Sequence, residues 1–195
     1  MDITEFWAIV DAARLGAATL PGDPREAVAT ALTDRLAATS KQTILEYQER
    51  FDELHAAIYR WDVWAAAYLI GGGCSDDSFM DFRAGLIAQG RDWYERAALS
   101  PDSLADHPDV IAGARKRHDW ALFCESANYA GPNAYERVSG DEDDCTFYDD
   151  FKEFQAARTP AEPIDMGEDF DFDDAAEMHT RFPRLAALYL RPKTS

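Results

Sequence analysis

The sequence predicts an all-α fold, an irregular bundle of about seven to nine helices in a single domain. Three observations predict it. Apolar residues recur at positions i, i+3, i+4 and i+7 along most of the chain. Helix-capping residues and chain breakers divide that pattern into short segments. No segment alternates as a half-buried strand does, and 195 residues with 47% hydrophobic content are enough for one sizeable core.

The N-terminal third carries the clearest helical pattern. Apolar residues between 3 and 10 predict a first amphipathic helix. Asp23 is a suitable N-cap, and Pro24 a suitable first-turn residue, for a second helix. Ser40 caps a third helix, whose apolar stripe steps by three and four residues and either continues or bends near Trp61.

The middle of the chain predicts two further helices. Three glycines at 71–73 end the preceding helix. Ser75 caps the next one, and the two aspartates that follow favour its first turn because the helix dipole attracts negative charge there. Trp93 and Tyr94 give an apolar side to a short helix that follows Gly90.

A proline-containing connector leads to the last predicted helices. One helix is expected from about Ile111 through Ala127, with Pro132 breaking or kinking the chain after it. The segment F-P-R-L-A-A-L-Y-L closes the chain as a short helix that begins at Pro183.

The C-terminal part differs in composition from the rest. From Asp141 to Glu177 there are fifteen acidic residues, two basic ones and six aromatic ones. We interpret this stretch as a loosely structured arm that packs its aromatic rings on the body and points its carboxylates outward. The predicted organisation is a helical body at 1–140, with an acidic arm and a C-terminal helix at 141–195 packed on the same domain.

Charge and cysteine content narrow the function classes. A net charge of −18 disfavours binding to nucleic acid or to an anionic membrane surface. Cys74, Cys124 and Cys145 are an odd, widely spaced set that fits neither a disulfide framework nor a paired zinc or redox motif. The N-terminus lacks the basic start and unbroken apolar run of a signal peptide, and no stretch approaches a membrane span. We therefore expect a cytoplasmic protein without disulfides.

Residues 60–106 carry a specific series of motifs. A tryptophan-rich helix is followed by G-G-C-S-D-D-S-F, then by F-R, L-I and Q-G, a short W/Y-containing helix and P-D-S-L. This series resembles an uncharacterised bacterial family, one of the domains of unknown function common in actinobacteria, and E-F-W and F-P-R-L-A-A-L-Y-L are similar to the ends of its members. Some members are fused to a WGR module and some are named molybdenum metabolism regulator, but the resemblance implies little about activity. Gly85 departs from the pattern, which has tryptophan there, and this puts in doubt any role that needs an aromatic ring at that position.

Seven residues around the glycine turn are the candidate ligand-binding residues: Trp61, Trp64, Cys74, Ser75, Asp76, Asp77 and Arg83. Asp76 and Arg83 lie two turns apart on one helix face, and Arg83 borders an aromatic face, so we expect it to be at least half buried and paired with a carboxylate. The cluster suits either a structural ion pair or a ligand site in which Arg83 holds an anion. The two tryptophans form either core or a pocket wall. The helix start after Cys74 favours a thiolate, whereas the two aspartates oppose it.

No catalytic, cofactor or metal motif is recognised. The acids at 169–174 match the start of a calcium loop, but Asp174 and Thr180 stand where that loop needs glycine and glutamate. The histidines and cysteines have no zinc spacing, and no P-loop, dinucleotide-binding or nucleophile-elbow motif occurs. We therefore predict no catalytic residue, no cofactor and no metal.

These observations favour a non-catalytic binding or regulatory module whose working surface is the junction from Gly72 to Arg83. Its partner would be an unidentified protein or a small anionic ligand. One alternative is a small enzyme that uses Asp76 or Asp77 as an acid–base group and Arg83 as an anion clamp. Another is an acidic phosphate mimic that binds a basic partner through its arm. A polar pocket beside Arg83 would favour the ligand hypotheses, and a dry ion pair with either aspartate a structural role.

Overall fold

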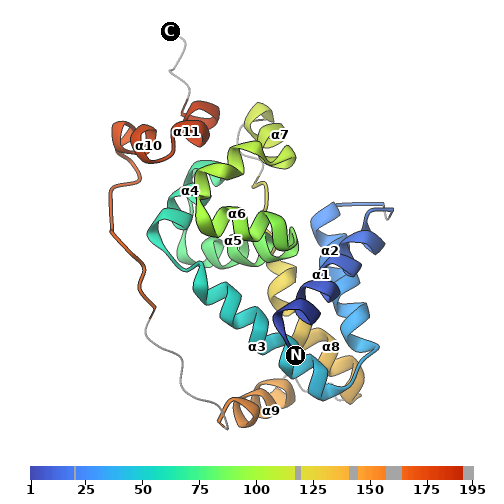
Figure 1. Ribbon diagram of the computed structural model, residues 1–195. Helices are drawn as coiled ribbons and strands as arrows, with labels where there is room; N and C mark the ends of the chain where they lie inside the picture. Colours follow the sequence, from blue (N-terminus) through green and yellow to red (C-terminus); the bar gives the residue numbers. More distant parts are fainter. Residues whose placement is uncertain (20, 117–119, 141–144, 157–163, 191–195) are drawn as a thin grey trace.

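The computed structural model describes residues 1–19, 21–116, 120–140, 145–156 and 164–190, which form eleven α-helices, two 3₁₀-helices and no strand (Figure 1). The helices are α1 Ile3–Ala17, α2 Pro24–Ala37, α3 Lys41–Ala57, α4 Trp61–Gly71, α5 Asp76–Ala88, α6 Arg91–Leu99, η1 Pro101–Asp106, α7 Pro108–Lys116, η2 Glu125–Tyr129, α8 Ala130–Ser139, α9 Cys145–Ala156, α10 Ala175–Arg181 and α11 Pro183–Tyr189. The all-α prediction is confirmed. The described residues form more helices than the seven to nine predicted. The region after residue 111 is divided among several helices, and the acidic arm forms helices of its own.

Side-chain caps define the starts of the first three helices. Asp2 and Glu5 form a reciprocal capping box at the start of α1. Asp23 and Ser40 each accept a hydrogen bond from a backbone N–H of the first turn that follows, and Pro24 occupies the first position of α2. These contacts are local in sequence, which is why the predicted starts of α2 and α3 are confirmed.

The long apolar stripe that begins in α3 is divided between two helices. α3 ends at Ala57 and α4 begins at Trp61, so of the two alternatives left open, a continuous helix or a bend near Trp61, the structure shows the second, as a break. Arg60 stabilises this break by binding the Asp62 carboxylate through Nε and Nη2, at 2.9 and 2.8 Å. α4 ends at the glycine run, where Gly72 has a φ of 68°, a left-handed conformation that glycine adopts without strain.

The helix predicted over 111–127 is wrong, because α7 ends at Lys116 and a turn precedes η2. Trp120 and Leu122 have φ values of 44° and 74°, which a right-handed helix cannot contain. The turn lies directly against α5, since a Cβ added to Gly85 would stand 1.5 Å from the carbonyl oxygen of Leu122. Glycine at 85 therefore permits this close approach and leaves no room for the aromatic ring of the family pattern.

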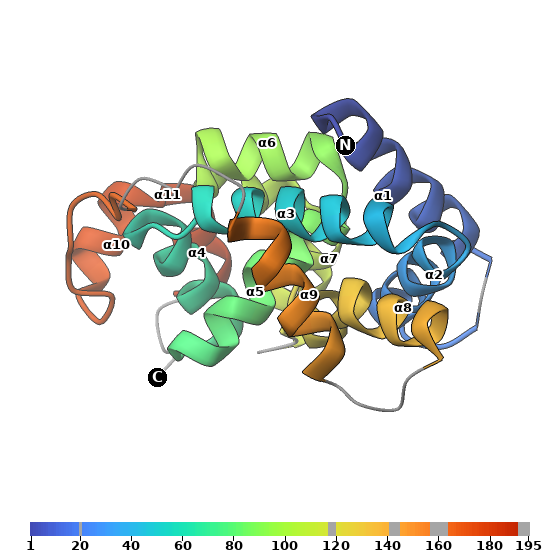
Figure 2. The ribbon, with the colours of Figure 1, turned by 90° about the horizontal axis from the view of Figure 1, so that it is seen from below.

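The C-terminal part of the chain packs on the body through several elements. α9 lies against α3 and α8 (Figure 2) and buries Phe147 and Phe151. The extended segment 164–174 runs along the edge of the molecule to α10 (Figure 1). α11, with α10 packed on it, contacts α4, α7 and η1. Five of the six aromatic rings pack on the body as predicted, whereas Tyr148 is 54% exposed. In the described part of the arm, α9 and α10 are regular helices where a loose structure was expected.

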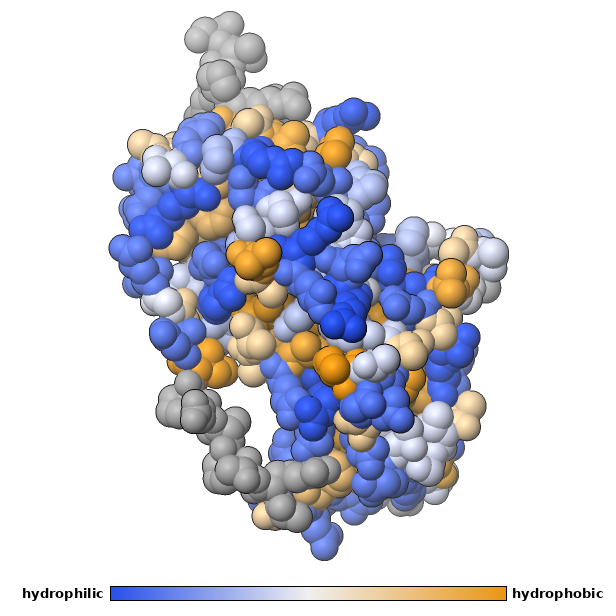
Figure 3. Space-filling model, viewed as in Figure 1, coloured by the Kyte–Doolittle hydropathy of each residue, from blue (hydrophilic) through white to orange (hydrophobic). Residues whose placement is uncertain are grey.

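The surface is predominantly polar in the view of Figure 3. Hydrophobic residues on this face form small separate patches rather than one continuous area. Exposed carboxylates of segment 164–174 add to its acidity: Asp165, Glu168, Asp169, Asp171, Asp173 and Asp174. In the described part of the chain, none of the helices combines the length and the apolar character that a membrane crossing requires.

Candidate functional site

A ladder of aromatic rings joins α4, α5 and the connection between α3 and α4. Trp61 stacks on Trp64 with 5.4 Å between ring centroids, and Trp64 stacks on Phe79 at 4.8 Å. Phe79 in turn stacks on Tyr59 at 5.8 Å. The indole N–H of Trp64 donates to the carbonyl oxygen of Cys74 at 3.0 Å, which ties the glycine turn to α4. Both predicted tryptophans are thus used in packing between elements.

Cys74 and Ser75 have local partners in the turn before α5. Ser75 and Ser78 form a reciprocal capping box, in which each hydroxyl oxygen accepts the backbone N–H of the other residue. Burial raises the pKa of the Cys74 thiol to about 11. Because the thiolate is the nucleophile, a pKa this high disfavours nucleophilic chemistry at neutral pH. Cys74 and Cys124 are free thiols, and the side chain of Cys145 lies outside the described part of the chain.

The structure separates the two candidate aspartates from Arg83. Asp76 and Asp77 are exposed in the first turn of α5, whereas Arg83 is only 8% exposed. Seven residues of helix place Asp76 and Arg83 roughly 10 Å apart along the axis. Among the described residues, no carboxylate forms an ion pair with Arg83. The predicted burial of Arg83 is confirmed. The predicted carboxylate partner is wrong, because the side chain reaches α3 while the first-turn aspartates stay in water.

Arg83 contacts a histidine and two aromatic rings. Its Nη1 donates to Nδ1 of His55 and to the carbonyl oxygen of His55, both at 2.9 Å. The guanidinium carbon lies 4.6 Å from the ring centroid of Tyr59 and 4.9 Å from that of Phe79, within cation–π range. Nε is buried and has no hydrogen-bond partner among the described residues. Burial lowers the pKa of Arg83 to about 10, so the group remains charged at neutral pH.

His55 is neutral and its tautomer is defined by its contacts. Nε2 lies 3.0 Å from the carbonyl oxygen of Met80, which can only accept, so Nε2 carries the hydrogen. Nδ1 is then the unprotonated acceptor for Arg83. Burial, and secondly the charge of Arg83, lower the pKa of His55 to about 4. Within the described part of the chain, the positive charge of Arg83 is therefore stabilised by dipoles and aromatic rings and forms no ion pair.

Arg83 lines a shallow surface hollow of about 290 Å³, together with Asp52, His55, Ala56, Tyr59 and Ile164. Asp52 accepts a hydrogen bond from the Gln48 amide at 2.7 Å, and burial raises the pKa of Asp52 to about 6. Sequence reasoning missed Asp52 and His55. The available signal was the spacing of Asp52 and His55 on one face of α3, with Tyr59 four residues further on, just after the helix ends. Nothing local indicates that this face meets Arg83. Within the described residues, no group of three or more histidines, cysteines or acids is placed to hold a metal ion.

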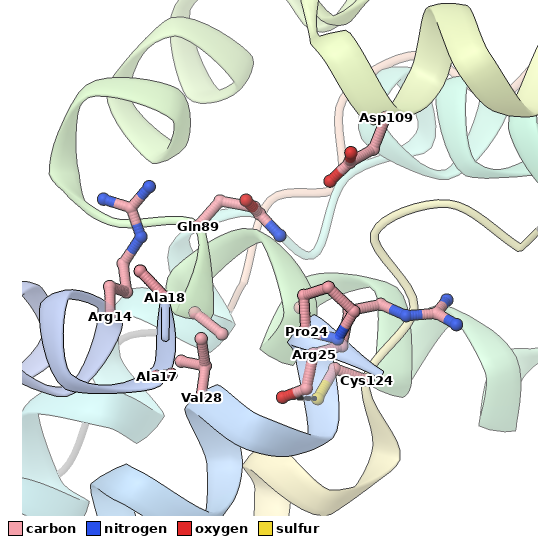
Figure 4. A pocket seen from close by; sticks show the side chains of 11 residues that line it. Arg14, Ala17, Ala18, Pro24, Arg25, Val28, Gln89, Asp109 and Cys124 are labelled. Carbon is pink, nitrogen blue, oxygen red and sulfur yellow. Dashed lines mark hydrogen bonds between the residues drawn. The ribbon is translucent and has the colours of Figure 1, made fainter. Parts of the chain in front are cut away.

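A second groove lies where the start of α2, the end of α5 and α7 meet (Figure 4). Two hollows of about 190 and 370 Å³ share Pro24, Arg25 and Asp109. Arg25 donates through Nε and Nη2 to the two carboxylate oxygens of Asp23. Nη1 of Arg14 lies 3.6 Å from Oδ1 of Asp11. Burial raises the pKa of the Cys124 thiol in this groove to about 11. Both arginines already have a carboxylate within ion-pair distance, whereas Arg83 has none among the described residues.

Comparison with known proteins places the chain in a family. The sequence profile of the family described as "Protein of unknown function (DUF4240)" matches residues 1–137, more than half of the chain. The chain belongs to the DUF4240 family. The DUF4240 match includes all seven predicted site residues and every residue of the Arg83 hollow except Ile164. No curated protein and no solved structure matches the chain.

Proposed function

We propose that this DUF4240 protein is a cytoplasmic, non-catalytic binding module that holds a small anion in the hollow around Arg83. One observation carries the proposal: a buried guanidinium lies at a surface hollow and has no carboxylate partner among the described residues. In this largely desolvated position, the guanidinium forms no ion pair with a described residue. A bound anion supplies a counter-charge, so the site favours an anionic ligand over an empty state.

The neighbouring groups support binding rather than proton transfer. Both ring nitrogens of His55 are occupied, one by Arg83 and one by the carbonyl group of Met80. Asp52, the other acid–base group in the hollow, already accepts a hydrogen bond from Gln48. The free thiols of Cys74 and Cys124 are consistent with a reducing compartment such as the cytoplasm.

Thermal unfolding in different anions tests this proposal. Wild type, Arg83→Met and the control Arg91→Met are compared in sodium acetate, benzoate, phosphate and chloride at equal ionic strength. Arg91 is a suitable control because it is exposed and, among the described residues, pairs with the carboxylate of Glu95, four residues later. At ten times its Kd, a bound anion raises the free energy of unfolding by about 1.4 kcal/mol, or the Tm by roughly 3–6 °C.

The expected result is a saturable rise in Tm with at least one anion, in wild type and Arg91→Met but not in Arg83→Met. An equal rise in Arg83→Met places the binding elsewhere and contradicts the proposal. Absence of a saturable effect with all of the anions contradicts it as well.

A further inference from the structure

The outer face of α4 is aromatic rather than polar. Within α4, which the structure describes in full, the residues that are not buried are Trp61, Asp62, Trp64 and Tyr68. The three aromatic residues share one side of the helix, because they follow one another at intervals of three and four positions. A helix face turned to water usually carries charged and polar groups, so these rings gain from being covered by another segment.

An extended strap, residues 164–174, contacts this face and runs on to α10 (Figure 1). The ring of Phe172 lies against Trp61 and Tyr68, at 6.1 and 5.5 Å between centroids. The hydroxyl of Tyr68 donates a hydrogen bond to the carboxylate of Asp173. An aromatic anchor with polar contacts beside it is the arrangement by which a folded domain holds a peptide segment.

The strap is attached weakly between firmly packed ends. None of its residues is buried, and six of them are acids, with no lysine or arginine among them. Its main chain is linked to α4 through the carbonyl oxygen of Met166, which accepts from the backbone N–H of Trp61 at 3.0 Å. By contrast, α9 on one side and α10 and α11 on the other bury large apolar side chains. Local opening of the strap therefore leaves both ends packed.

The aromatic face and the strap also differ in their relation to the family. Trp61, Trp64 and Tyr68 lie within residues 1–137, which match DUF4240, whereas the strap lies beyond the match. The face thus belongs to the matched domain, and the segment that covers it does not.

We propose that the outer face of α4 is a docking site for an extended acidic segment of a partner protein, and that the strap occupies this site in the unbound protein. The strap itself defines the chemistry of the partner segment: an aromatic ring that packs against Trp61 and Tyr68, followed directly by a carboxylate that accepts from the Tyr68 hydroxyl. Tethering gives the strap a roughly millimolar effective concentration, so weak contacts keep it docked until a partner segment that binds more tightly displaces it. This inference does not depend on anion binding at Arg83.

A fluorescently labelled peptide with the sequence of the strap tests the inference. Fluorescence anisotropy measures its binding to the full chain at about 0.15 M salt, which screens repulsion between the acidic peptide and the acidic protein beyond about 8 Å. Phe172→Ala and Asp173→Ala each remove a different contact of the strap and leave α4 unchanged. Tyr148→Ala is the matched control, because it removes an exposed aromatic ring of α9, outside the strap.

We expect the peptide to bind both strap variants at least about tenfold more tightly than wild type or Tyr148→Ala, because the internal competitor is weakened. A peptide that carries Phe172→Ala should bind these variants at least about tenfold more weakly than the unmodified peptide. Adding Tyr68→Ala to the Phe172→Ala chain should abolish saturable binding. Equal affinity for wild type and both strap variants overturns the inference, and so does binding that survives Tyr68→Ala. Absence of binding to both strap variants overturns it as well.

Discussion

At the scale of single residues, Arg83 and His55 depend on each other. Arg83→Met leaves Nδ1 and the carbonyl oxygen of His55 without their donor, at a cost of about 1–3 kcal/mol. Adding His55→Phe removes the ring acceptor and preserves stacking on Phe51. We expect the double variant to be at least about 0.5 kcal/mol more stable than the sum of the single effects implies. Denaturant unfolding of the four proteins measures this, and simple additivity would show that the pair is not coupled.

Asp52 makes the folded protein less stable as the pH rises. Its folded pKa of about 6 lies above the ordinary value of 3.8, so the folded state binds a proton more tightly within that window. The free energy of unfolding therefore falls as the pH rises from 3.8 to 6. Asp52→Asn should be more stable than wild type at pH 7, by on the order of 1–2 kcal/mol, and equal to it near pH 4.

His55 has the opposite effect over an overlapping range. Its folded pKa of about 4 lies below the ordinary 6.5, so its contribution is fully present above pH 6.5 and is lost as the pH falls towards 4. The two trends offset each other in wild type, so Asp52→Asn should lose stability more steeply on acidification. Tm measured from pH 4 to 8 checks this, and parallel curves for the two proteins would refute the role of Asp52.

At the scale of elements, the contact between α5 and the turn at 121–124 depends on one missing side chain. Gly85→Ala places a Cβ 1.5 Å from the carbonyl oxygen of Leu122, so backbone must move. We expect a loss of about 1–3 kcal/mol or more. Gly16→Ala is the matched control, because no atom lies within 4 Å of the added Cβ in α1 and alanine favours the helix. A loss in Gly85→Ala no larger than that in Gly16→Ala would contradict the packing described.

At the scale of the whole molecule, aromatic rings attach the acidic segment 164–177 to the body, and repulsion among its carboxylates weakens that attachment. Phe172 contacts Trp61 and Tyr68, at 6.1 and 5.5 Å between centroids. Residues 164–177 contain seven acids and no lysine or arginine. Salt screens their repulsion, with a Debye length of about 10 Å at 0.1 M. Hydrogen exchange in 164–177 should therefore slow as salt is added, while exchange in α3 and α5 hardly changes, and a salt-independent rate would show that repulsion is unimportant there.

Much of the fold is predictable from sequence because helix starts are local events. The caps at Asp23, Ser40 and Ser75 act on N–H groups within three residues, so the pattern alone predicts them. The helix predicted over 111–127 fails because the left-handed turn there is stabilised against Gly85, a residue far away in the sequence. Apolar periodicity carries no information about such a long-range contact.

The sequence by itself determines that the chain is helical, that α5 begins at Ser75 and that Arg83 borders a buried aromatic face. Helical spacing specifies which residues share a face, and for that reason it suggested Asp76 as the partner of Arg83. Only the tertiary structure decides what that face meets. His55 lies 28 residues earlier, and the packing of α3 on α5 brings it to the guanidinium. The candidate site follows from this contact between helices, because burial against α3 desolvates Arg83 and, among the described residues, gives it a histidine rather than a carboxylate as its partner.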